Sequence, residues 1–324
     1  MIYQNLGRSG LLVSRVGLGC NNLGRPQTPT QTLEGSRQVV VAALEAGITT
    51  FDLADIYGGY PGQSEEIFGQ ILKDLAVRRE DIVIISKFGL PMGDTSSPAH
   101  QARGSRRYLR QALEASLKRL GTDYLDLYIH HTPDASTPVE ETLTALGELV
   151  AAGKVRYLAS SNYAGWQIAQ AHYLGQQLGS RYIAAENHYN LLDRRAELEV
   201  IPACQNLGLG LLPYFPLANG LLTGKYRQGQ QTPGRLTSLK PQILEAANWE
   251  QLQAFSDLAQ QAGMTELELA FSWLAAQEPV GSVIAGATSP QQVEANASAL
   301  KKLGEDLLAE LDRIFPAPEP IALF

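Results

Sequence analysis

Four titratable side chains lie at or just beyond the carboxyl ends of three successive apolar, strand-like segments: Asp52, Tyr57, Lys87 and His131. In a parallel α/β protein, ligands bind beyond the carboxyl ends of the strands, so we expect these groups to meet there. A carbonyl accepts hydride poorly until its oxygen is hydrogen-bonded or protonated. Tyr57 could supply that proton, and we expect the ammonium of Lys87 to lower its pKa from the usual ~10. Asp52 would hold Lys87, and His131 would orient the oxygen. The set suits carbonyl reduction.

Two adjacent histidines end the third of these segments. Neighbouring strand residues point to opposite faces, so only one should face the strand ends. We assign that role to His131, which directly precedes the exit of the chain at Thr132, and we expect His130 to pack elsewhere. The same divergence makes a metal site at the pair unfavourable, because no third ligand follows at useful spacing. We therefore predict no metal.

A second set of residues could bind a cofactor. Ser161 and Asn162 end the fifth strand-like segment with groups suited to a carboxamide, Glu186 ends the sixth, and Tyr214 near the end of the seventh offers a flat ring for stacking. The segment that begins at Gly286 opens a helix whose free N–H groups could bind an anion, and an ordinary helix cap there is an equal alternative. No GxGxxG motif follows a strand, which argues against a Rossmann domain.

The elements that must position these groups alternate regularly. The eight strand-like segments span residues 16–20, 49–54, 82–88, 125–131, 155–161, 182–189, 209–215 and 281–286. Amphipathic helical patterns separate them, which predicts a parallel (β/α)8 TIM barrel within the α/β class. We expect a β-hairpin cap at residues 2–14, additional helices at about 241–263 and 305–315, and a functional loop at 219–238. Residues 1–324 are predicted to form a single domain.

Composition narrows the partners and the compartment. With 44% hydrophobic and 18% charged residues, the 324-residue chain can form a sizeable core. A net charge of −7 argues against nucleic acid or an anionic membrane as partner. The two cysteines, Cys20 and Cys204, form no disulfide framework, and neither a signal peptide nor a spanning segment is recognisable. We expect a cytoplasmic protein, and the oligomeric state is not readable.

Taken together, these motifs resemble the aldo-keto reductases along nearly the whole chain, especially the bacterial and potassium-channel β-subunit-like branches. The family's FDxAxxYG corresponds to Phe51–Gly58, its G-x-S-E to Gly62–Glu65, its lysine strand to Ile85–Gly89 and its LYxxHxPD to Leu127–Asp134. The resemblance implies a barrel that binds an extended nicotinamide dinucleotide. It also implies that Tyr57 is the general acid, Lys87 and Asp52 its tuning pair, and His131 the carbonyl-orienting residue.

The resemblance further implies a set of cofactor contacts. Ser161 and Asn162 would hold the carboxamide, Tyr214 would stack on the nicotinamide, and Lys225 and Arg235 would contact the phosphates. The complete expected set is Cys20, Asn21, Asp52, Ser161, Asn162, Glu186, Tyr214, Phe215, Pro216, Leu217, Asn219, Gly220, Lys225, Arg235, Gly286, Thr288, Gln292 and Asn296.

Several positions depart from the family pattern. Glu186 stands where Gln is usual beside the carboxamide, and an ionised Glu cannot donate to the carboxamide oxygen. Phe215 replaces a Ser, Ala295 replaces a Glu, and Gln292 occupies a position where some branches place Arg. We expect NADP(H), with NAD(H) as the alternative.

The resulting hypothesis is NADPH-dependent reduction of aldehydes, extending to ketones or sugar carbonyls, with a small carbonyl compound as the substrate. One alternative is a polyol or sugar dehydrogenase that runs in the oxidising direction. Another is a redox-sensing or regulatory subunit that binds the dinucleotide and turns over slowly. The substrate would be selected by loops at about 22–32, 89–104, 132–137 and 217–238, whose few charges favour neutral carbonyls.

Overall fold

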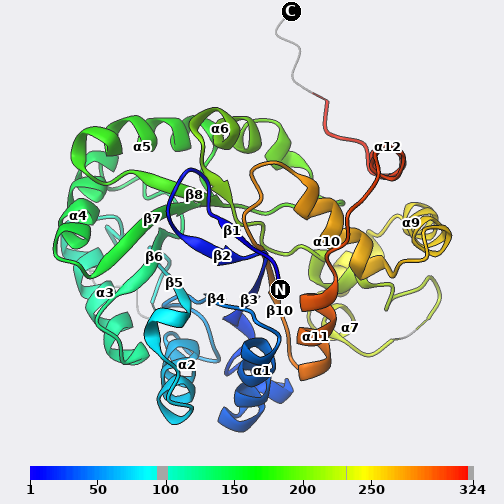
Figure 1. The fold of residues 1–324 in the computed structure, drawn as a ribbon, viewed down its shortest axis with the longest axis horizontal. Helices are drawn as coiled ribbons and strands as arrows, with labels where there is room; N and C mark the ends of the chain where they lie inside the picture. The colour runs from blue at the N-terminus through cyan, green and yellow to red at the C-terminus, as the bar shows by residue number, and fades with distance from the viewer. Residues whose placement is uncertain (93–100, 231, 320–324) are drawn as a thin grey trace, which may run out of the picture.

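Eight parallel strands curl into a (β/α)8 barrel (Figure 1). The computed structural model describes residues 1–92, 101–230 and 232–319, so part of the predicted substrate loop at 89–104 lies outside the described residues. The strands follow in the order β10 (Val283–Gly286), β3 (Val16–Gly19), β4 (Thr50–Asp52), β5 (Val83–Phe88), β6 (Leu125–His130), β7 (Val155–Ser161), β8 (Tyr182–Glu186) and β9 (Gly210–Leu211). The ring closes beside β10, where Leu211 bridges Val280 and accepts a 2.8 Å hydrogen bond from the N–H of Gly281. All eight strands fall within the predicted segments, although β9 is much shorter than expected.

Helices follow the strands and form the outer layer (Figure 1). In chain order these are α1 (Leu33–Glu45), α2 (Gln63–Asp74), α3 (Arg106–Leu120), α4 (Val139–Ala151), α5 (Gly165–Leu178), α6 (Val200–Leu207), α10 (Glu266–Ala276) and α11 (Pro290–Ser298). Their ends agree with local sequence signals. For example, Ser105 caps the first turn of α3 through the N–H of Tyr108, and Gly121 ends that helix at a φ of 66°.

The chain between β9 and α10 carries the additional helices that the sequence suggested. The segment expected at 241–263 forms two helices, α8 (Pro241–Glu245) and α9 (Trp249–Gln261), because Asn248 begins a new helix by accepting a hydrogen bond from Gln251 N. The short helix α7 (Arg235–Leu239) precedes them. The last helix, α12 (Glu305–Ile314), packs against α9, where the rings of Phe255 and Phe315 lie 5.4 Å apart.

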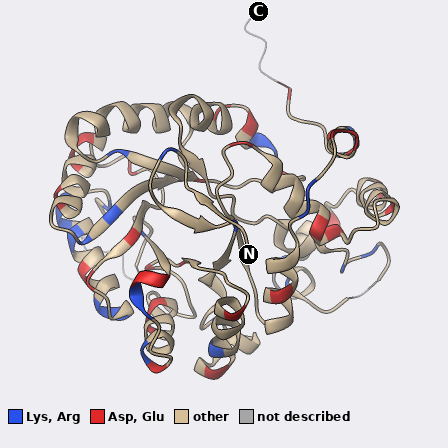
Figure 2. Ribbon diagram, viewed as in Figure 1, with Lys and Arg blue, Asp and Glu red and all other residues tan. Residues whose placement is uncertain are grey.

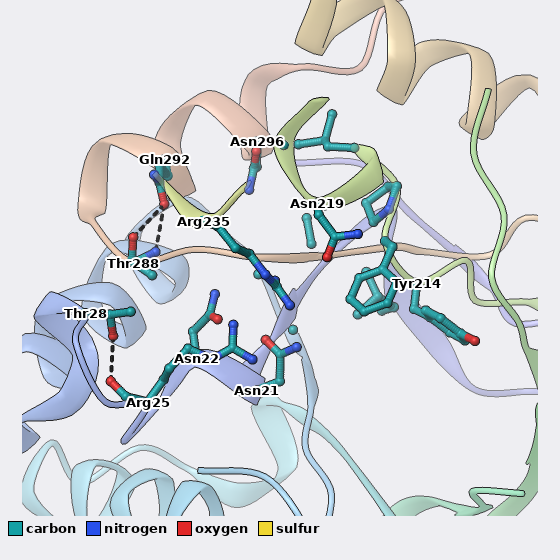
Figure 3. A pocket seen from close by; sticks show the side chains of 18 of the residues that line it. Asn21, Asn22, Arg25, Thr28, Tyr214, Asn219, Arg235, Thr288, Gln292 and Asn296 are labelled. Atoms are coloured by element: carbon teal, nitrogen blue, oxygen red, sulfur yellow. Dashed lines mark hydrogen bonds between the residues drawn. The ribbon is translucent and has the colours of Figure 1, made fainter. Parts of the chain in front are cut away.

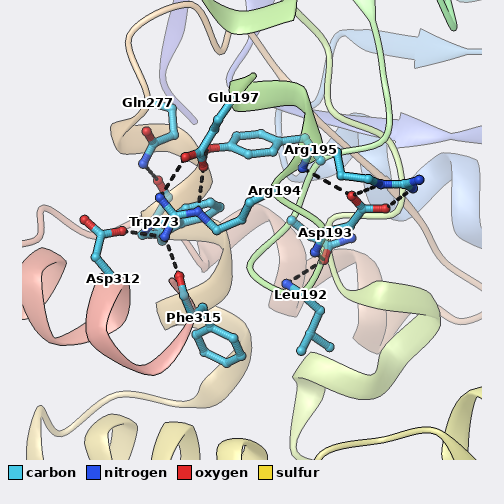
Figure 4. A network of polar contacts seen from close by, with 11 residues as sticks. Leu192, Asp193, Arg194, Arg195, Glu197, Trp273, Gln277, Asp312 and Phe315 are labelled. Atoms are coloured by element: carbon cyan, nitrogen blue, oxygen red, sulfur yellow. Dashed lines mark hydrogen bonds and ion pairs between the residues drawn. The ribbon is translucent and has the colours of Figure 1, made fainter. Parts of the chain in front are cut away.

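Arg194, between β8 and α6, anchors this carboxyl-terminal segment to the barrel (Figure 4). Its guanidinium donates to Glu197 at 2.7 and 2.9 Å, to Asp312 at 2.7 Å and to the carbonyl of Phe315. It also lies 5.1 Å from the ring centroid of Trp273 on α10. One largely buried cation therefore joins three distant parts of the chain.

The amino-terminal hairpin, β1 (Tyr3–Asn5) and β2 (Leu12–Ser14), covers the end of the barrel at which the strands begin (Figure 1). Leu6, Leu11 and Val13 join the apolar cluster inside the barrel. The turn seats closely, since a Cβ on Gly7 would lie 2.4 Å from the backbone nitrogen of Gly210. With this end sealed, the opposite end, where the strands finish, is left for a ligand.

Charged residues lie mainly on the outer helices and on the loops around the barrel (Figure 2). Against that pattern, Asp52, Lys87 and Glu186 are buried, with at most 3% of each residue exposed, and each lies at or next to the last residue of its strand. Charges are rarely buried unless they are paired or functional, so these three mark the region of interest. Within the described part of the chain, no helix is both long and apolar enough to cross a bilayer.

Candidate active site

Lys87 is the centre of a buried polar cluster. Its ammonium contacts the carboxylate of Asp52, donates to the carbonyl of Leu53 at 3.0 Å and to the hydroxyl of Tyr57 at 3.3 Å, and lies 3.4 Å from Glu186 Oε1. Parallel pairing places Asp52 beside Ile85 on the adjacent strand β5, two residues before Lys87 and on the same face. Burial acts to lower the pKa of Lys87, but the two carboxylates outweigh it and raise the pKa above its usual value, so Lys87 stays charged.

Tyr57 differs from expectation in its acidity. Burial raises the pKa of its hydroxyl above the usual value, the charge of Lys87 acts in the opposite direction, and Asp52 and Glu186 add to the increase. The prediction of a lowered pKa was therefore wrong for the protein as it stands. The cost of moving a phenolate out of water exceeds the attraction of one ammonium that is already shared by two carboxylates. Tyr57 is thus a neutral hydroxyl group at physiological pH.

The two histidines point into different surroundings. His131 lines the pocket at the end of the barrel, and its ring lies 5.9 Å from that of Tyr57 in an edge-on arrangement. Burial and the nearby Lys87 lower the pKa of His131 to about 2, so its imidazole is neutral. His130 stacks on Phe88 at 4.8 Å and forms a 2.8 Å hydrogen bond through Nδ1 with the hydroxyl of Tyr163.

A pocket of about 920 Å³ opens from this cluster across the carboxyl ends of the strands (Figure 3). Of the predicted site residues, those that line it are Asn21, Asp52, Tyr57, His131, Ser161, Asn162, Glu186, Tyr214, Phe215, Pro216, Leu217, Asn219, Gly220, Lys225, Arg235, Gly286, Thr288, Gln292 and Asn296. Lys87 lies beneath the lining, within reach of Tyr57. Cys20 was predicted to contact the cofactor, but it does not line the pocket. Its side chain is completely buried in the core, because the short helix η1 (Cys20–Asn22) places Asn21 and Asn22 in the pocket wall instead.

One wall is built by the ends of β7 and β8 and by the segment after β9. Ser161 pairs with Glu186 in the parallel register, and Asn162 adopts a left-handed φ of 60°. The amide of Asn162 donates to the carbonyl of His131 at 2.9 Å and accepts from the hydroxyl of Tyr214 at 2.7 Å. This wall is therefore held in place by hydrogen bonds before any ligand arrives.

Positive charge gathers further along the pocket, where Arg25 and Arg235 lie near each other (Figure 3). The lining also includes Lys225. Burial lowers the pKa of Lys240, and both arginines lie close enough to lower it further. Burial and Arg25 lower the pKa of Arg235 to about 10, and its Nε is buried without a hydrogen-bond partner. Arg235 and Lys240 flank the ring of Phe215 at 5.6 and 5.2 Å. A group of cations assembled in this way suits a multiply charged anion such as a phosphate.

Sequence reasoning missed Arg25 and Lys240. Each lies in a chain segment without a periodic pattern, and only folding brings it to Arg235. The one available signal was that Arg25 falls within the loop at about 22–32, which was expected from the sequence to help select the substrate.

The far end of the pocket is formed by the start of α11. Ser289 caps this helix by accepting a hydrogen bond from Gln292 N, and the side-chain oxygen of Gln292 accepts one from Thr288 N at 2.8 Å (Figure 3). The helix cap is therefore confirmed, and anion binding at this segment, which also lines the pocket, stays a prediction.

Comparison with known proteins identifies the chain. The sequence model described as the Aldo/keto reductase family matches residues 15–315. The chain belongs to the aldo/keto reductase family. It is 36% identical to an L-glyceraldehyde 3-phosphate reductase of Escherichia coli O157:H7, over 97% of this chain and 92% of the relative. It is 37% identical to the uncharacterized oxidoreductase YrpG of Bacillus subtilis (98% and 97%), and 34% identical to a probable voltage-gated potassium channel subunit beta of Oryza sativa (93% and 91%).

Membership of this family makes the protein an oxidoreductase that acts on carbonyl compounds, in a family that generally uses a nicotinamide dinucleotide. The residues present fit such a cofactor. Two buried polar atoms without a hydrogen-bond partner among the described residues, Glu186 Oε2 and Arg235 Nε, belong to side chains that line the pocket. Glu186 lies beside the wall of polar groups, and Arg235 lies among the cations.

Proposed function

We propose that this protein reduces aldehydes, and ketones or sugar carbonyls, to alcohols with NADPH, and that Tyr57 is the general acid. The observation that supports this role is the 3.3 Å hydrogen bond from Lys87 Nζ to the Tyr57 hydroxyl, on the pocket floor and facing His131. NADPH would supply the hydride to the carbonyl carbon. Ser161, Asn162 and Tyr214 would bind its nicotinamide, and the cations around Arg235 would bind its phosphates.

The protein groups have distinct tasks in this scheme. Tyr57 is protonated, so it can donate a hydrogen bond to the substrate oxygen and then give up the proton as negative charge develops there. The ammonium of Lys87 would stabilise the resulting phenolate, and Asp52 would keep Lys87 in place. A neutral His131 carries one N–H, which could bind the same oxygen and orient the carbonyl.

The preference for NADPH over NADH rests on the three cations Arg25, Arg235 and Lys240. NADPH carries one more phosphate than NADH, and each buried or partly buried cation gains more from the additional charge. The two free, buried cysteines suit a reducing compartment, so we also propose a cytoplasmic location. We treat residues 1–324 as one catalytic domain.

The test is NADPH oxidation against a panel of aldehydes, ketones and aldoses, together with L-glyceraldehyde 3-phosphate, which appears in the name of one relative. We expect turnover above background with at least one aldehyde. In Tyr57→Phe, kcat should fall by ~10²-fold or more, while the Kd for NADPH stays nearly unchanged. Tight NADPH binding without turnover on any carbonyl would overturn the reductase proposal in favour of a sensing role. Equal turnover by Tyr57→Phe would remove Tyr57 from its role.

A further inference from the structure

Two buried carboxylates share one ammonium at the floor of the pocket. Asp52 on β4 is in direct contact with Lys87 on β5, and Glu186 on β8 places Oε1 3.4 Å from the same nitrogen. The other charged or titratable groups that face Glu186 are the hydroxyls of Tyr57 and Tyr214. The only cation that faces Glu186 among the described residues is therefore Lys87, and Asp52 already neutralises it.

This arrangement determines which group carries a proton. With both carboxylates ionised, the cluster would hold a net negative charge away from water, which is costly. Burial raises the pKa of Asp52 as well, but its closer contact with Lys87 opposes that increase, so we assign the negative charge to Asp52. Glu186 has the longer contact, is 2% exposed and has an Oε2 without a hydrogen-bond partner. Burial and the charge of Asp52 raise the pKa of Glu186 to about 8, so its side chain is mostly protonated at neutral pH.

Glu186 also faces the pocket. It lines the pocket, pairs with Ser161 in the sheet and accepts a hydrogen bond from Asn162 N through its carbonyl at 3.2 Å. These are the residues to which the proposed function assigns the nicotinamide, and the present inference rests on that assignment. A protonated carboxyl can donate one hydrogen bond and accept another, as an amide does, whereas an ionised carboxylate only accepts.

The two oxidation states of the nicotinamide differ in charge. The oxidised ring is a cation and the reduced ring is neutral. A cation brought beside Glu186 supplies the charge that the cluster lacks, and it favours the ionised carboxylate. A neutral ring supplies none and leaves the carboxyl protonated.

We propose that Glu186 makes the pocket respond to the oxidation state of the dinucleotide: it stays protonated when the reduced form binds and ionises when the oxidised form binds, so that NADP⁺ binding releases one proton and becomes tighter as the pH rises. The proton passes from the carboxyl of Glu186 to solvent, and no electrons move. At higher pH the same residue favours the complex with oxidised dinucleotide over that with the reduced form.

The test is isothermal titration calorimetry of NADP⁺ and of NADPH in two buffers with different ionisation enthalpies. At pH 7 we expect release of close to one proton with NADP⁺ and close to none with NADPH. The ratio of the two affinities should shift toward NADP⁺ by up to ~10-fold per pH unit below the pKa of free Glu186. Both dinucleotides carry the same phosphates, so protons that are exchanged by phosphate groups cancel in the comparison.

Three variants locate the effect. Glu186→Gln should remove the difference in proton release between the two dinucleotides and most of the pH dependence of the affinity ratio. Glu148→Gln, a matched change on the outer helix α4, and Tyr57→Phe, which removes the adjacent hydroxyl, should both retain the difference.

Equal proton release by the two dinucleotides in the wild-type protein would overturn the inference, even if Glu186→Gln failed to fold. A difference that persists in Glu186→Gln would also overturn it. Binding of both dinucleotides without any proton difference leaves the proposed function intact and refutes only the inference. If neither NADP⁺ nor NADPH binds, both the proposed function and the inference are refuted.

Discussion

Replacing Lys87 by Met should destabilise the protein in a pH-dependent manner. Lys87 is completely buried, and its ammonium is the cation that faces both Asp52 and Glu186. Methionine fills a similar volume without the charge. Of the two carboxyl groups beside Lys87, only Glu186 holds a proton near neutral pH in the wild-type protein, whereas in the variant Asp52 must also be protonated to remain buried.

The size of the effect follows from that one additional proton. An unfolded chain releases the proton of an Asp at pH ~3.9, while the folded variant must retain it. The folded state then binds one more proton than the unfolded state, so stability falls as the pH rises, by ~1.4 kcal/mol per pH unit. Over the ~3 units between the unfolded pKa and pH 7, the loss reaches ~4 kcal/mol. This agrees with the ~3–5 kcal/mol usual for breaking a buried ion pair.

Urea unfolding at pH 5, 6 and 7 measures this directly. The difference in free energy of unfolding between wild type and Lys87→Met should widen with pH. The double variant Lys87→Met with Asp52→Asn, which has no Asp52 carboxyl to protonate, should recover most of the loss at pH 7 and abolish the widening. A difference that stays constant with pH, or a double variant no more stable than the single one, would refute the reasoning.

Three further outcomes follow from the geometry. Because the pKa of His131 is lowered to about 2, the pH profile of kcat/KM for aldehyde reduction should show no limb near pH ~6.5. His131→Leu should lower kcat/KM ~10–10²-fold without changing the Kd for NADPH. A limb near pH ~6.5 that disappears in this variant would contradict the assignment of a neutral His131. Arg235→Met should weaken NADPH binding in fluorescence titrations ~10-fold or more, and less at high salt, because it removes a partly buried cation from the proposed phosphate region. Unchanged affinity would exclude Arg235 from the site. Burial raises the pKa of Glu186, so as the pH rises the unfolded chain releases this proton at a lower pH than the folded protein does. The free energy of unfolding of wild type, relative to that of Glu186→Gln, should therefore fall by ~1.4 kcal/mol per unit as the pH rises from ~4.5 toward about 8. Parallel plots of unfolding free energy against pH for the two proteins would contradict this.

The positions of the site residues were largely predictable from the chain. Asp52, Lys87 and His131 end apolar segments of strand length, and parallel strands bring their carboxyl ends to one edge. Alternation along β6 separated His131 from His130 without knowledge of their neighbours. These inferences depended on periodicity and on short motifs, which are local properties of the sequence.

Properties that depend on the sum of several distant contacts were not predictable. The expected acidity of Tyr57 considered Lys87 alone, but the depth of burial and the arrival of Glu186 from another strand reverse the direction of its pKa shift. Cys20 directly precedes the pocket-lining residue Asn21 in sequence, yet the turn of η1 points its thiol into the core. The group around Arg235 forms only when irregular segments far apart in the chain come together.

The hairpin at the barrel base has a consequence for how the chain folds during synthesis. Its contacts are with residues made much later, since Gln4 donates to the carbonyls of Val280 and Gly281 at 2.8 and 2.9 Å, and Arg8 N donates to the carbonyl of Gly208 at 2.8 Å. The hairpin residues are therefore synthesised some 200 to 277 positions before the partners that they contact. Contacts between residues so far apart in sequence form slowly, and until they form the apolar side chains of Leu6, Leu11 and Val13 lack the barrel interior in which they are buried. Exposed apolar side chains favour aggregation, so the nascent chain is aggregation-prone until the segment around residues 208–281 has been made.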